Sequence, residues 1–98
     1  MKLRFRDRVL ERLYTERDFS GGFPKEIVKL YRKRIAMIRA APDERDFYAL
    51  KSLHFEKLSG KRKLQRSIRL NERLRLVLEF EGAGKEKTAL IVAIEDYH

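Results

Sequence analysis

The chain has 98 residues, no cysteine, and 24 Lys and Arg against 15 Asp and Glu, which gives a net charge of +9. The lack of cysteine excludes disulfides and Cys-based zinc sites, and two histidines are too few for a His-rich metal site. We find no signal peptide and no apolar run that could span a bilayer. We therefore expect one cytoplasmic domain over residues 1–98, without metal or cofactor. Its charge suits a polyanion such as nucleic acid, although a merely soluble basic surface is the alternative.

The first half of the chain predicts one short strand followed by helices. Polar and apolar residues alternate over Lys2–Arg6, which indicates a strand. Asp7 is a suitable N-cap for a short helix after it. Apolar residues at helical spacing predict a longer helix over residues 24–41, with a proline at each end. A helical turn is expected over Asp43–Leu50, with Phe47 and Leu50 directed inward.

The second half changes to the two-residue period of β-strands. The last apolar run is hydrophobic on both faces, which is typical of a central strand covered on both sides. The predicted helices therefore come mainly before the predicted strands. The expected strands are His54–Leu58, Gln65–Leu70, Leu74–Phe80 and Thr88–Ile94.

A hairpin between two of these strands places two arginines side by side. A three-residue loop, Asn71–Arg73, keeps the apolar faces of both strands together and puts Arg69 opposite Arg75. Two like charges in direct opposition are unfavourable, and a phosphate bound between them would remove the penalty. Alternatively, the two side chains splay into solvent or pair with Glu79 or Glu95.

Basic residues are concentrated around this hairpin, with only Glu72 opposing them. Arginine binds phosphate in a bidentate manner and stacks on bases, so the cluster suits nucleic acid. A solvated hairpin face and a docking site for an acidic protein segment are the alternatives. His54, alone on its strand, is interpreted as an ordinary edge or partly buried histidine. The cluster comprises Lys61, Arg62, Lys63, Arg66, Arg69, Arg73 and Arg75.

The last three residues add groups that can move protons. Asp96, Tyr97 and His98 directly follow the predicted central strand, so they should be positioned rather than loose. RNA cleavage without a metal needs a base for the 2′-hydroxyl, cations for the phosphate, and an acid for the leaving oxygen. Tyr97 and His98 could transfer the protons, and Arg69 and Arg75 could stabilise the charge.

These features together resemble the HigB-type toxins of the RelE/ParE superfamily, from bacterial type II toxin–antitoxin systems. The resemblance covers most of the chain and is strongest from Leu50 to His98. It implies that the fold class is α+β and the fold RelE-like, in which N-terminal helices pack on a twisted, mostly antiparallel sheet. The residues that carry it are Leu53-His54-Phe55-Glu56-Lys57-Leu58, Gly60, Arg62, Ser67-Ile68-Arg69-Leu70-Asn71, Arg75-Leu76 and Ile94-Glu95-Asp96-Tyr97-His98.

The resemblance also implies an activity: a ribosome-dependent endoribonuclease that cuts mRNA in the ribosomal A site and inhibits translation. It implies neutralisation by a HigA-type helix-turn-helix antitoxin, with operator DNA bound only through the toxin–antitoxin complex. The residues at positions linked to activity are Arg69, Arg75, Asp96, Tyr97 and His98. The residues expected to bind RNA are Lys57, Lys61, Arg62, Lys63, Arg66 and Arg73.

Two alternatives to the nuclease stay open. A ParE-like protein of the same superfamily inhibits DNA gyrase without catalysis, although the terminal acid–base residues argue against that function here. The second alternative is a catalytically degenerate toxin that only binds its antitoxin. It is suggested by the absence of several aromatic residues that are common in the family. The positions that depart from the family pattern include Leu64, Arg66, Leu74 and Leu78.

Overall fold

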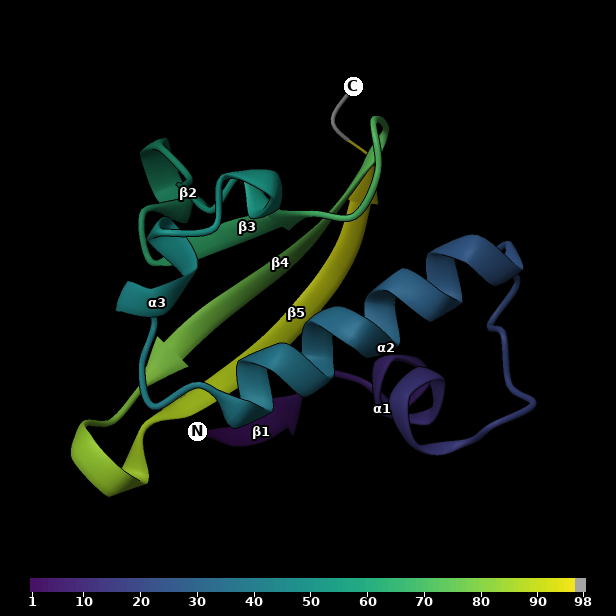
Figure 1. Cartoon of the computed structure of the whole chain (residues 1–98), viewed down its shortest axis with the longest axis horizontal. Helices are drawn as coiled ribbons and strands as arrows, with labels where there is room; N and C mark the ends of the chain where they lie inside the picture. Colours follow the sequence, from purple (N-terminus) through teal and green to yellow (C-terminus); the bar gives the residue numbers. More distant parts are fainter. Residues whose placement is uncertain (97–98) are drawn as a thin grey trace.

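A mixed sheet with helices across one face forms the protein in the computed structural model, which describes residues 1–96 (Figure 1). Predictions for Tyr97 and His98 lie outside the described residues. The strands lie in the order β1-β5-β4-β3-β2; β1 runs parallel to β5 and the other neighbours are antiparallel. This confirms the α+β prediction. The elements are β1 (Lys2–Phe5), α1 (Arg8–Thr15), α2 (Lys25–Ala40), α3 (Arg45–Tyr48), η1 (Lys51–Leu53), β2 (Glu56–Lys57), η2 (Gly60–Arg62), β3 (Gln65–Arg69), β4 (Leu74–Glu81), η3 (Gly84–Glu86) and β5 (Thr88–Asp96).

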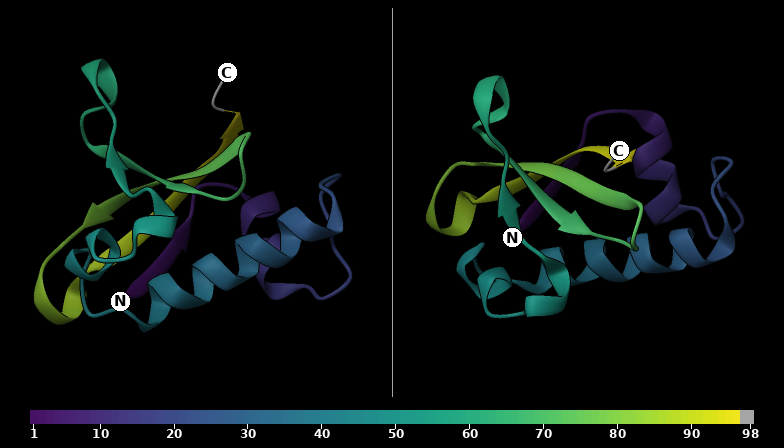
Figure 2. Two further views of the ribbon diagram at one scale, coloured as in Figure 1. Left: turned by 45° about the horizontal axis from the view of Figure 1, so that its top comes forward. Right: turned by 90° about the horizontal axis from the view of Figure 1, so that it is seen from above.

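Helix α2 crosses one face of the sheet and covers the hydrophobic core (Figures 1 and 2). It begins directly after Pro24, whose missing N–H is not needed there. Its apolar residues lie at helical spacing, as predicted, and face the sheet, because packing against the sheet buries that side of the helix. None of the helices in residues 1–96 is long and apolar enough to cross a membrane. The buried residues of α2 are Ile27, Val28, Tyr31, Ile35 and Ile38.

Polar groups of α2 attach it to α1. The side chain of Asp7 caps α1 by accepting from the Leu10 backbone N–H at 2.9 Å, as predicted. The hydroxyl of Tyr31 donates to the Leu10 carbonyl at 2.7 Å. Burial raises the pKa of Tyr31, and the nearby charge of Asp7 adds to the rise. Arg32 donates to the Leu13 carbonyl at 2.7 Å. The bonds of Tyr31 and Arg32 therefore join α2 to α1.

Two local predictions in the middle of the chain are wrong. Leu50 is 47% exposed instead of directed inward, because the chain turns into η1 at this point and buries Leu53. The strand expected over His54–Leu58 is reduced to β2, which has two residues. His54 has a left-handed backbone with φ of 46°, and its N–H closes the η1 turn on the Lys51 carbonyl. Strand pairing therefore begins only after it.

The hairpin between β3 and β4 has the predicted register. Arg69 lies opposite Arg75, and the Leu70 N–H donates to the Leu74 carbonyl at 2.9 Å. The side-chain oxygen of Asn71 accepts from the backbone N–H groups that follow in the loop, which stabilises the turn. The apolar residues of β4 therefore face α2, and Arg75 faces the opposite side, which we call the far face of the sheet.

A β-bulge in β5 changes which residues reach the far face. Val77 lies opposite Ala93 but Leu78 lies opposite Ile91, so Val92 is an extra residue on β5. The extra residue reverses the alternation of the strand beyond it. Ile94 consequently packs on the core, and Glu95 lies on the far face.

Candidate functional site

Three charged residues form a row on the far face of the sheet. Arg69 on β3 lies opposite Arg75 on β4, and Arg75 lies opposite Glu95 on β5. His54 extends the row beyond the start of β2. Glu56 pairs with Ser67 in an antiparallel register, and continuing that register by two residues places residue 54 opposite Arg69. We call His54, Arg69, Arg75 and Glu95 the far-face row. It crosses the sheet at the end where β5 runs towards the C-terminus.

Glu95 is held by two arginines. Its Oε2 accepts from Nη2 of Arg62 at 2.6 Å, and its Oε1 accepts from Nη2 of Arg75 at 3.4 Å. The side chain of Arg75 is 18% exposed and that of Glu95 is 31% exposed, so water screens the pairs only in part. Burial acts to raise the pKa of Glu95, but the hydrogen bonds and charges of Arg62 and Arg75 outweigh it and lower the pKa. Glu95 is therefore ionised at neutral pH.

Arg69 contacts a histidine that the sequence interpretation treated as ordinary. Its Nη1 lies 3.3 Å from Nε2 of His54, and its Nε donates to the Asn71 carbonyl at 3.2 Å. Arginine has no acceptor, so a hydrogen bond here requires Nε2 of His54 to be the acceptor and the imidazole to be neutral. The spacing from β2 to β3 could have revealed this neighbour, because it places residue 54 level with Arg69.

Asp96 lies at the end of β5 and pairs with the hairpin loop. Its Oδ2 accepts from Nη2 of Arg73 at 2.9 Å, and its backbone lies opposite Leu74. The hairpin loop and the end of β5 are thereby joined, and alternation after Glu95 puts Asp96 on the side of Leu74, opposite to the far-face row. The roles predicted for Tyr97 and His98, which follow Asp96, stay predictions.

The remaining basic residues of the predicted patch divide between the two faces of the sheet. Lys57 lies opposite Arg66, and Arg66 lies opposite the buried Leu78, so this pair is on the side of the helices. Lys61 and Lys63 are exposed at η2, which projects on the side away from α2 (Figure 2). Arg66 therefore does not belong to the single compact patch expected from the sequence, because side chains alternate along a strand. Lys57, which was expected to bind RNA, lies on the same side as Arg66.

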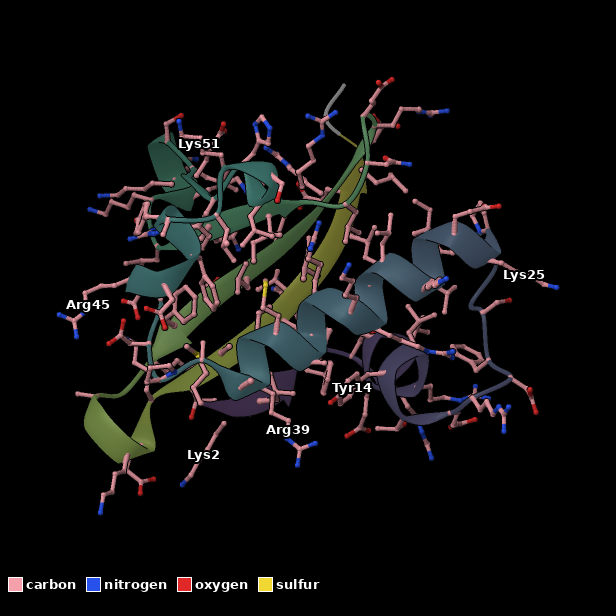
Figure 3. All side chains as sticks on the ribbon, viewed as in Figure 1. Lys2, Tyr14, Lys25, Arg39, Arg45 and Lys51 are labelled. Atoms are coloured by element: carbon pink, nitrogen blue, oxygen red, sulfur yellow. The ribbon has the colours of Figure 1, made fainter. Side chains whose placement is uncertain are left out.

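Positive charge also covers the outer surface of α2. Lys25 and Arg39 project outward from opposite ends of that helix in Figure 3, and both are exposed. Excess charge therefore does not by itself identify the functional face. The far-face row differs because its arginines are held in register by the sheet and by Glu95.

Comparison with solved structures defines the class of fold. The YoeB/ParE toxin from Agrobacterium tumefaciens superposes with a TM-score of 0.67 at 17% identity, covering 100% of both chains. The conserved hypothetical protein HP0894 from Helicobacter pylori superposes with a TM-score of 0.55 at 13% identity, covering 99% of this chain and 94% of its own. At these identities the similarity establishes the fold, which is RelE/YoeB-like.

Sequence comparison then identifies the family. The family described as the RelE-like toxin of the type II toxin–antitoxin system HigB matches residues 3–98. The chain belongs to this family of HigB-like toxins, and a type II toxin implies a cognate antitoxin. No curated protein sequence is significantly similar to the chain.

Proposed function

We propose that this toxin is a ribosome-dependent endoribonuclease that cleaves mRNA in the A site and thereby inhibits translation. The observation that carries the proposal is the adjacency of Arg69 and Arg75 on the far face, beside the strand that leads to Asp96. Two guanidinium groups fixed at neighbouring positions suit one phosphodiester. Membership of the HigB-like family supports the same function.

The proposed reaction is an internal transfer of the phosphate. The 2′-oxygen of the ribose attacks the adjacent phosphorus, the bond from phosphorus to the 5′-oxygen breaks, and a 2′,3′-cyclic phosphate and a 5′-hydroxyl result. A base receives the 2′-hydroxyl proton, and an acid gives a proton to the leaving 5′-oxygen. Arg69 and Arg75 stabilise the negative charge that develops on the non-bridging oxygens.

The proton-transfer groups are proposed from the sequence and from one contact. Tyr97 and His98 supply the acid and the base, with Asp96 at the end of β5 orienting the tail. His54 adds an imidazole beside Arg69, with its Nε2 3.3 Å from Nη1 of Arg69. When Arg69 turns from His54 to the phosphate, Nε2 of His54 becomes available to accept a proton.

The proposed partners follow from charge and family. Basic residues around the hairpin and η2 bind RNA phosphates, and their affinity falls with salt because counterions are released on binding. A HigA-type helix-turn-helix antitoxin neutralises the toxin in the cytoplasm, and operator DNA is bound only through that complex. The residues proposed to bind RNA are Lys57, Lys61, Arg62, Lys63, Arg66 and Arg73.

Removing Arg69 tests the site. R69A should lose cleavage by on the order of 100-fold, because one of two charge-stabilising groups is gone. R39A removes an equal charge from the exposed outer surface of α2 and should retain cleavage. Equal loss in both variants would show that charge, and not the far-face row, carries the activity.

A second test separates the nuclease from gyrase inhibition. Deleting Tyr97 and His98 should abolish toxicity to growing cells while the melting temperature stays near that of the full chain. Purified full-length toxin should leave the DNA supercoiling activity of gyrase unchanged. Inhibition of supercoiling by the full chain and by the deleted chain alike would instead favour a ParE-like function.

A further inference from the structure

We infer that Glu95 is a positioning residue that holds Arg62 and Arg75 together on the far face, in register with Arg69. The inference rests on the proposed function and explains how the arginines proposed to bind phosphate are kept in place. Glu95 itself contacts no substrate in this account. Its carboxylate joins η2, which carries Arg62, to the sheet, which carries Arg75.

The contacts of Glu95 are those of a bridge between two arginines. Each carboxylate oxygen takes one of them, at 2.6 Å for Arg62 and 3.4 Å for Arg75. Arg62 is held at a second point, where its Nε donates to Oε1 of Gln65 at 2.8 Å. Gln65 in turn donates to Glu79 at 3.0 Å. The hydrogen bonds thus run without a break from β4 through β3 and η2 to β5.

The physical role of this bridge is to offset repulsion. Three guanidinium groups close together repel one another and would splay into solvent in the absence of RNA. A negative charge between Arg62 and Arg75 offsets part of that repulsion and leaves the arginines preorganised before the substrate arrives. The β-bulge at Val92 is what makes this possible, since regular alternation would put Ile94 on the far face and Glu95 in the core.

Proton transfer is a poor alternative role for Glu95. Both of its oxygens accept from arginines, and the arginines lower its pKa. It therefore neither holds a proton to donate at neutral pH nor accepts one readily. The more serious alternative is that Glu95 competes with the substrate phosphate for the arginines. In that case, loss of the Glu95 charge would make cleavage faster.

Two variants and one matched control distinguish these roles. E95Q keeps the shape and loses the charge, and E95A removes the bridge. E81Q is the control, because Glu81 also pairs with an arginine, Arg4, at 2.8 Å, but at the opposite end of β4 from Arg75. Single-turnover cleavage on programmed ribosomes gives the rate, and titration of the same ribosomes with labelled toxin gives the affinity.

A positioning role predicts that the rate and the affinity separate. E95Q and E95A should cleave on the order of 10- to 100-fold more slowly once bound, since small misplacements of catalytic groups cost this much. Their affinity for ribosomes should stay equal or become tighter, because a negative charge is lost. E81Q should change neither. Faster cleavage by E95Q would overturn the inference in favour of competition, and a parallel loss of rate, affinity and melting temperature would reduce it to a structural role.

A measurement without ribosomes keeps the inference separate from the proposed function. The ¹⁵Nη signals of Arg62 should be resolved in the wild-type toxin, because the bridge hinders rotation of the guanidinium, and should merge in E95A. Unchanged Arg62 signals in E95A would overturn the bridge even if the toxin cuts mRNA. A wild-type toxin that fails to cut, but shows the spectral change, would overturn the nuclease and leave the bridge intact.

Discussion

Deleting Val92 should remove the bulge of β5 and leave Glu95 on the far face. Val92 is the extra residue of the bulge, since Val77 lies opposite Ala93 and Leu78 lies opposite Ile91. Without it, β5 would pair regularly with β4, because the residues on either side of the deletion already have their own partners. Ile94 would stay opposite Leu76, which is fully buried, and Glu95 would stay opposite Arg75.

The cost of the deletion can be worked from the burial of the residue that is lost. The Val92 side chain is 5% exposed, and losing a buried valine side chain costs about 1.5–3 kcal/mol. A shift of Glu95 into the core would add several kcal/mol, because an unpaired carboxylate would be taken out of water. A loss of about 2 kcal/mol lowers the melting temperature of a domain of this size by about 8–16 °C, out of a total stability of about 5–15 kcal/mol.

Thermal unfolding followed by circular dichroism measures the effect. V92A is the matched control, because it trims the same 5% exposed side chain and keeps the bulge. It should cost about 1.5 kcal/mol for two lost carbons. A deletion variant that is less stable than V92A by several kcal/mol would refute the reasoning, because Glu95 would then have left its place opposite Arg75.

Two further predictions concern stability. Y31F removes a buried hydroxyl that donates to the Leu10 carbonyl at 2.7 Å. It should lower the free energy of unfolding, measured with urea, by about 1–2 kcal/mol and leave cleavage unchanged. An unchanged urea midpoint would show that this hydrogen bond does not stabilise the fold. The pKa of Glu95 is lower in the folded protein than in the unfolded chain. Its contribution to the free energy of unfolding is therefore complete above the unfolded pKa of about 4.3 and is lost as the pH falls through the lower folded pKa. The difference in melting temperature between wild type and E95Q should therefore shrink below about pH 4, and a difference that is constant down to pH 2 would contradict the assignment.

Much of the fold could be predicted because its periodic signals are strong. The spacing of apolar residues in α2 and the capping side chain of Asp7 identified the helical layer. The β3–β4 register followed from requiring both apolar faces to agree, and that requirement correctly placed Arg69 opposite Arg75. Hydrophobic burial dictates these features locally, so the sequence alone carries them.

Other features depend on tertiary structure that the sequence leaves open. The run before Glu95 is apolar at every position, so no pattern could show that the bulge at Val92 reverses the alternation. The bridge from Arg62 to Glu95 spans 33 residues and depends on how η2 folds over the sheet. The contact of His54 with Arg69 depends on the η1 turn and on a left-handed backbone at residue 54.

Primer extension on a defined mRNA, with purified toxin and with or without translating ribosomes, tests the central claim most directly. The account predicts in-frame cuts that appear only when ribosomes translate the message, and that disappear in R69A but not in R39A. Cuts on naked RNA would contradict the ribosome dependence. An intact message under translation would contradict the nuclease itself.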